Sequence, residues 1–104
     1  MISLDVAKSH LRVDFDDEDN LIELYLKAAI EYAEGFIDRS IITSEEDRAH
    51  ESDIVVNNAI KSAILLILGH LYANREEESI DRATSPLQLG AKSLLLPYRI
   101  KMGV

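Results

Sequence analysis

Residues 59–75, AIKSAILLILGHLYANR, are apolar almost all the way round a helix. One stripe at helical spacing consists of Ile60, Ile64, Ile67, Leu68 and Leu71. Leu65, Leu66 and Tyr72 lie on the other side of the same helix. Such a helix needs burial on every face, and a chain of 104 residues supplies only a small core. The run is too short to span a bilayer, which takes about 20 apolar residues, so we expect other copies of the chain to cover it.

A second long helix is predicted over residues 18–39, with two apolar sides. Its charged residues share one narrow arc, formed by Glu23, Lys27, Glu31, Glu34 and Asp38. A surface helix needs one apolar stripe only slightly wider than about 100°, so one side should face the core and the other a neighbouring subunit. We assign to the core the side with Leu21, Tyr25, Tyr32 and Phe36. We assign to the subunit interface Ile22, Leu26, Ile30 and Ile37.

Two shorter helices complete an all-α, four-helix pattern with one long central helix. The first covers residues 4–12, with Ser3 as its N-cap. The last begins at Ser85-Pro86, where a serine cap precedes a proline at the first helical position. It runs to about Leu96, because Pro97 ends it. Residues 1–104 are expected to form a single domain, since domains of this size are typical.

The connection over residues 40–53 is polar and acidic, so we expect a surface loop. The β-prone segments Ile41–Ile42 and Ile54–Val56 flank it. They form either a short hairpin or, for Val55–Val56, the first turn of the next helix. Residues 76–84 form the second connection.

The charge of the chain argues against nucleic-acid binding. Nineteen acidic and 11 basic side chains give a net charge of −8. Affinity for DNA comes mainly from Lys and Arg on phosphates, so specific DNA binding is not expected. The chain has no cysteine, which excludes disulfides, zinc–thiolate sites and thiol chemistry. The N-terminus shows no signal-peptide pattern.

No motif for catalysis or cofactor binding is present. The sequence has no Gly-rich phosphate loop and no nucleophile elbow. The acidic run 14–19 does not match a calcium loop, which would need Gly in place of Asp19 and Glu in place of Tyr25. This run suits instead the positive N-terminus of the following helix. His70 lies among apolar residues and is interpreted as a core or interface histidine. We therefore predict no enzyme activity, no metal site and no cofactor.

Three stretches together resemble one protein family. They are residues 6–40, with HLRVD, an acidic loop and a long helix closing in DRS; residues 59–76, closing in YANRE; and residues 89–100, closing in LPYRI. Their order and spacing are similar to those of the head–tail connector proteins of long-tailed double-stranded DNA bacteriophages and prophages. The chain departs from several relatives in its short, very acidic loop and in Ile54–Val56, where those relatives have a proline before the third helix.

The resemblance implies a structural protein that is not an enzyme. Such connectors assemble into a ring, twelve-fold in the virion, below the portal at the head–tail junction. The ring extends the DNA channel and offers a docking surface to the next connector, stopper or tail protein. The implied partners are other copies of the chain, the portal and that downstream protein. DNA would pass an acidic lumen without specific binding, and no membrane is involved. The protein would be made in the cytoplasm of the bacterial host.

Several residues are candidates for these contacts. Arg75 either contacts a neighbouring subunit or forms a salt bridge within its own chain. Tyr98 and Arg99 either contact the portal or a neighbour, or pack the C-terminus onto the bundle. Candidates to line the acidic lumen, or to form an acidic loop, are Glu45, Glu46 and Asp47.

Two other functions remain as alternatives: a small acidic helical adaptor for a protein partner, and a DNA mimic. Two apolar helix faces favour the connector, because a mimic does not need them.

Overall fold

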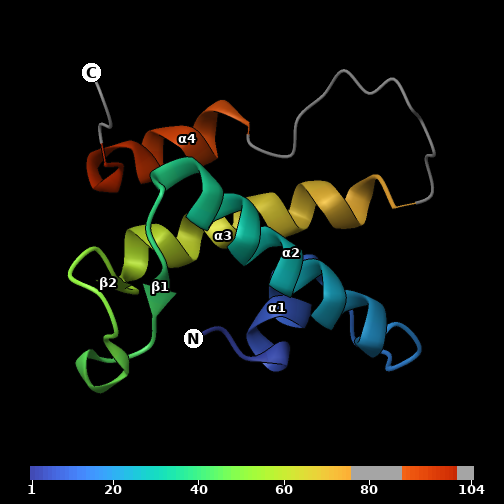
Figure 1. Ribbon diagram of the computed structural model, residues 1–104. Helices are drawn as coiled ribbons and strands as arrows, with labels where there is room; N and C mark the ends of the chain where they lie inside the picture. The colour runs from blue at the N-terminus through green and yellow to red at the C-terminus, as the bar shows by residue number, and fades with distance from the viewer. Residues whose placement is uncertain (76–87, 101–104) are drawn as a thin grey trace.

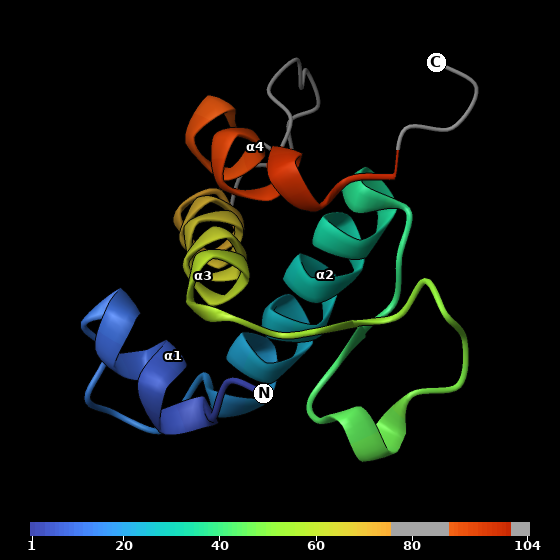
Figure 2. The same cartoon turned by 90° about the vertical axis from the view of Figure 1, so that its left-hand side faces the viewer.

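Three helices surround a fourth in this computed structural model, which describes residues 1–75 and 88–100 (Figures 1 and 2). The α-helices are α1 (Leu4–Leu11), α2 (Asp19–Ile37), α3 (Asn58–Ala73) and α4 (Leu89–Leu95). Short 3₁₀ turns are η1 (Glu45–Asp47) and η2 (Leu96–Tyr98). All four predicted helices are present, but the last begins only at Leu89 with Gln88 as its N-cap, and the predicted cap at Ser85-Pro86 lies outside the described residues.

The ends of the helices follow local capping chemistry. The Ser3 hydroxyl accepts a hydrogen bond from the Val6 N–H at 3.2 Å, which confirms the predicted N-cap. The Asn57 side chain caps α3 by accepting from the Ile60 N–H at 2.9 Å. At its C-terminus α2 stops at Asp38, whose φ of 60° is left-handed and turns the chain toward the loop.

Two very short strands pair in parallel, which corrects both alternatives for residues 41–56. β1 (Ile41–Ile42) pairs with β2 (Ile54–Val55), with Ile41 opposite Ile54. The intervening loop turns back on itself, so the second strand runs in the same direction as the first and no hairpin forms. Val55 belongs to the strand rather than to the helix, because α3 begins only at Asn58.

The core is built around α3, which the chain covers by itself on several sides. Figure 2 shows α3 nearly end-on, with α1, α2 and α4 arranged around it. Its fully buried side chains are Ile60, Ala63, Ile64, Ile67 and Leu68. A Cβ at Gly69 would lie 3.4 Å from His10 Nε2, so α1 approaches α3 closely there. The expectation that other copies must cover α3 is therefore wrong for most of its surface, because three helices of the same subunit cover it.

The side of α2 that was predicted to form the subunit interface faces the core instead. Ile22 and Ile37 are fully buried in the subunit core and Leu26 is only 8% exposed, while Ile30 is partly buried. Ala29 and Ala33 lie among them and are also buried, and their small side chains let α2 approach α3. Ile22, Leu26 and Ile37 are therefore not available to a neighbouring subunit, whereas Ile30 keeps an exposed part. Of the residues predicted to face the core, Tyr32 is 41% exposed, whereas Tyr25 and Phe36 are partly buried against the core as expected.

Candidate assembly surfaces

The outer side of α2 carries an apolar stripe that its own chain covers only in part. This α2 stripe consists of Leu21, Leu24, Ala28, Tyr32 and Gly35. Their spacing of three, four, four and three residues places them on one line along the helix. Leu24 is 61% and Tyr32 41% exposed. A hollow of about 390 Å³ lies in the stripe, lined by Ala28, Glu31 and Tyr32. Exposed apolar side chains in such a line are typical of a surface that binds another protein.

A second exposed apolar surface lies on α4. This α4 ridge consists of Leu89, Lys92, Ser93 and Leu96, all exposed, on the side opposite the buried Ala91 and Leu95. Leu89 is 79% and Leu96 55% exposed. The exposed Leu66 of α3 lies beside it, 3.7 Å from the position of a Cβ on Gly90. The subunit therefore presents two different apolar surfaces on two different helices.

The C-terminal segment is tied to the end of α2. Ile100 N–H donates to the Ile37 carbonyl at 3.0 Å, and the Arg99 guanidinium lies 4.8 Å from the centroid of the Phe36 ring. Arg39 Nη1 donates to the Tyr98 carbonyl at 3.1 Å. Tyr98 is partly buried against the core, whereas Arg99 is exposed. The packing interpretation of these two residues is thus realised in the subunit, and Arg99 still offers donors to solvent.

Arg75 forms an ion pair within its own chain. Its Nε lies 3.5 Å from Glu18 Oε2, and its guanidinium lies 3.9 Å from the centroid of the Tyr72 ring. The Tyr72 hydroxyl donates to Glu18 Oε1, and this hydrogen bond raises the pKa of Tyr72. Glu18 immediately precedes α2, so the cluster joins the start of α2 to the end of α3. This is the intrachain alternative predicted for Arg75.

Lys8 organises the acidic run before α2. Its Nζ lies 2.8 Å from Asp16 Oδ1 and 2.7 Å from Asp19 Oδ1. The hydrogen bond to Asp16, followed by that to Asp19, raises the pKa of Lys8. Among the described residues, no group of three or more His, Asp or Glu side chains is arranged to hold a metal ion. The acidic run therefore joins α1 to α2.

The acidic loop is ordered by two residues that sequence patterns did not single out. Arg48 donates to both carboxylate oxygens of Glu45, at 2.8 and 2.9 Å, and to the Asp53 carbonyl at 2.7 Å. The Asp53 carboxylate is buried and accepts from the N–H groups of Ala49 and His50, at 2.8 and 3.0 Å. The predicted acidic residues Glu45, Glu46 and Asp47 are all exposed in η1. They thus project from a loop that is held in place from within.

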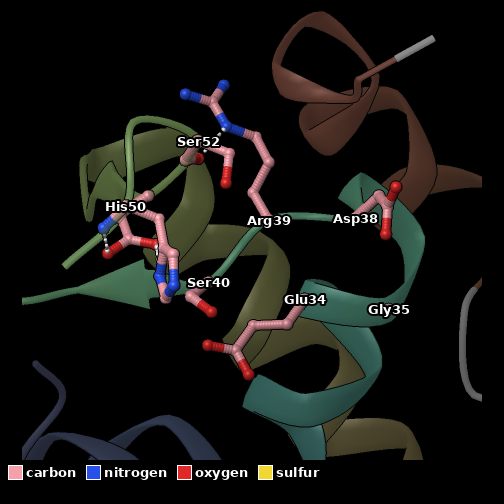
Figure 3. A pocket seen from close by; sticks show the side chains of 8 residues that line it. Glu34, Gly35, Asp38, Arg39, Ser40, His50 and Ser52 are labelled. Carbon is pink, nitrogen blue, oxygen red and sulfur yellow. Dashed lines mark hydrogen bonds and ion pairs between the residues drawn. The ribbon is translucent and has the colours of Figure 1, made fainter. Parts of the chain in front are cut away.

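A polar hollow of about 490 Å³ separates this loop from the end of α2 (Figure 3). Several of its charged groups already have structural partners. Glu34 Oε2 accepts from the Ile41 N–H at 2.8 Å, and Arg39 Nε donates to the Ser52 carbonyl at 2.7 Å. His50 Nδ1 lies 3.8 Å from Asp53 Oδ1. We interpret the hollow as a structural junction that positions the acidic loop on α2. Arg39 was missed in the sequence because its partners are backbone carbonyls far along the chain.

Asp53→Ala is expected to loosen the loop and to lower the urea midpoint of unfolding. The two backbone N–H groups hold the pKa of Asp53 below its ordinary value of 3.8. Because the folded pKa lies below the unfolded one, the contribution of Asp53 is fully present above about pH 4 and is lost as the pH falls through the folded pKa. Urea titrations of both proteins should therefore differ by a constant amount from about pH 5 to pH 7 and converge in stronger acid. A difference that persists unchanged at about pH 2 would contradict this role.

Comparison with known proteins gives two matches. A sequence model of the phage gp6-like head-tail connector proteins matches residues 1–99. The crystal structure of bacteriophage HK97 gp6 is similar, with 25% sequence identity and a TM-score of 0.68, over 95% of this chain and 93% of that one. Curated protein sequences give no match to the chain. In the part of the chain that the structure describes, none of the helices is long and apolar enough to cross a membrane.

Proposed function

Since the chain belongs to the phage gp6-like head-tail connector family, we propose that it forms a ring below the portal of a phage head. The family consists of structural proteins of the virion and not of enzymes. The ring would be twelve-fold in the virion, would extend the DNA channel and would present a docking surface to the next connector, stopper or tail protein. The observation that carries the proposal is the family match over residues 1–99, together with the similar fold of HK97 gp6.

Two different exposed apolar surfaces on one subunit support assembly into a ring. The α2 stripe and the α4 ridge lie on separate helices, and each exposes large apolar side chains. A contact between two different surfaces of identical subunits is heterologous, so it repeats from subunit to subunit and closes into a ring at a suitable rotation. A monomeric adaptor would need one such surface, and a DNA mimic would need neither. The connector is therefore favoured over both alternatives.

The acidic balance of the chain supports a channel that DNA passes without binding. The net charge is −8, and the exposed Glu45, Glu46 and Asp47 project from one loop. We propose that these acidic side chains face the channel, where they repel phosphate groups. DNA is then a passing cargo, and its retention depends on the parts that assemble below.

Exposed donors at the C-terminal end are our candidates for contacts with the portal. Arg99 is exposed beside Tyr98, and an aromatic ring next to a guanidinium is a frequent anchor of protein interfaces. Arg75 keeps an exposed part beyond its ion pair with Glu18 and is a candidate for an additional subunit contact.

Sedimentation of the purified chain tests the proposal, alone and mixed with a DNA duplex at about 150 mM salt. We expect a species larger than the monomer, formed more fully as protein concentration rises, and no sedimentation of DNA with it. A chain that remains monomeric at millimolar concentration would favour the adaptor. A stable complex with the duplex would contradict a channel that repels DNA.

A further inference from the structure

We propose that the α4 ridge of one subunit packs on the α2 stripe of a second copy of this chain. The inference rests on the proposed function, because it names the surfaces through which the connector assembles. The α4 ridge cannot reach the stripe of its own subunit, since the opposite side of α4, with Ala91 and Leu95, is buried in the core against α3. The exposed leucines of the ridge therefore point away from the subunit that carries them.

The shapes of the two surfaces match. The stripe combines small positions at Ala28 and Gly35 with larger side chains at Leu24 and Tyr32, and the hollow at Ala28 is open to solvent. A helix can approach closely over small residues, and a leucine of the partner can enter the hollow between larger ones. On the ridge, Leu89 and Leu96 are seven residues apart, two helical turns, so both point the same way.

The charges of the two surfaces are also complementary. Residues 88–100, which include the ridge, contain the basic Lys92 and Arg99 and no acidic residue. The α2 helix is acidic, and the exposed Glu31 lines the hollow in the stripe. Among the described residues, neither the Glu31 carboxylate nor the Lys92 ammonium has a hydrogen-bond or ion-pair partner within the subunit. Lys92 of the ridge would thus meet Glu31 of the next subunit, while the leucines fill the hollow.

This pairing would allow a chain with a net charge of −8 to self-associate. Surfaces of like charge repel, and an isologous contact of two α2 stripes would bring the Glu31 carboxylates beside them together. A contact that brings Lys92 of the ridge to Glu31 beside the stripe places opposite charges together at every repeat. The second copy is therefore favoured as the occupant of both surfaces.

Disulfide trapping tests the contact, because the chain has no cysteine of its own. Ala28→Cys and Ser93→Cys are made separately and together in the full-length chain and oxidised mildly. The two single variants, when mixed, should give mixed disulfide dimers, and the double variant should give a ladder of cross-linked oligomers. Disulfides form only where Cα atoms come within about 7 Å, so the ladder reports the contact itself. Ser9→Cys, on the exposed side of α1, replaces Ser93→Cys in the matched control.

Charge reversal supplies a second readout. Lys92→Glu should lower the yield of the ladder about tenfold, and Glu31→Lys in the same chain should restore it. Dimers of Ala28→Cys with itself, or a ladder no stronger than that of the Ser9 control, would overturn the proposed pairing. If the wild-type chain still sediments as a large species in that case, the connector proposal stands and only these surfaces are wrong. If the wild type is also monomeric at millimolar concentration, both proposals fail.

Discussion

Replacing Leu26 with glutamate is expected to unfold the subunit, while the same change at Leu24 leaves it folded. Leu26 lies in the core between α2 and α3, so a carboxylate there would be desolvated without gaining a hydrogen-bond or ion-pair partner. The expected cost is about 4 kcal/mol or more, a large part of the total stability of a small domain. Leu24 lies two positions earlier and faces solvent on the α2 stripe. A glutamate side chain at that position stays hydrated, so the free energy of unfolding should change by no more than about 0.5 kcal/mol.

Urea unfolding followed by far-ultraviolet circular dichroism distinguishes the two variants. Leu26→Glu should lack a folded baseline or lose most of its urea midpoint, and Leu24→Glu should unfold as the wild type does. Sedimentation of the folded Leu24→Glu protein then tests the exposed side of α2, where a carboxylate in place of an apolar side chain of the stripe should weaken self-association. Equal stability of the two variants would show that the side of α2 assigned to the core is wrong.

The sequence predicted the helices well because each has a strong helical period. The apolar runs of α2 and α3 and the Ser3 cap are local signals, and α1, α2 and α3 formed close to their predicted bounds, whereas α4 begins later than predicted. Periodicity also showed that α2 has two apolar sides. It could not show which side faces inward, because that depends on how α3 packs. The alanines Ala29 and Ala33 among the isoleucines were the available signal, since small residues mark the close approach of two helices.

The connection between α2 and α3 could be predicted only as a loop. Its order comes from contacts that leave no periodic trace, such as those of Arg48 with backbone carbonyls and of Asp53 with backbone N–H groups. The parallel pairing of β1 and β2 likewise depends on the path of the whole loop. Two β-prone residues on each side predict pairing but not its direction. The sequence shows several leucines in α4 but not which of them are exposed. The burial of Ala91 and Leu95 in the structure shows that Leu89 and Leu96 face solvent.

Deletion of the gene from its phage or prophage is expected to separate heads from tails. If the ring completes the portal opening, heads that lack it have no surface for the next connector or tail component. Electron microscopy of induced lysates should show heads beside free tails, and infectious particles should fall to background. The protein is structural, so the defect should appear in particle assembly, with no change expected in DNA synthesis or in the number of heads.

Complementation from a plasmid links this defect to the surfaces of the subunit. Wild-type protein should restore joined particles, whereas Leu24→Glu should fail although it folds, because its neighbour contact is lost.

Tyr98→Ala with Arg99→Ala removes an aromatic ring and a forked donor, a loss of typically about 2 kcal/mol or more where both serve as anchors. The carbonyl at position 98 still accepts the hydrogen bond from Arg39 and the Ile100 N–H still donates to the Ile37 carbonyl, while the packing of the Tyr98 ring on the core is lost. Normal joining by the double variant would exclude the portal role of Tyr98 and Arg99. Normal joining after complete deletion would exclude the connector function itself, because no other part of the proposal can supply the missing ring.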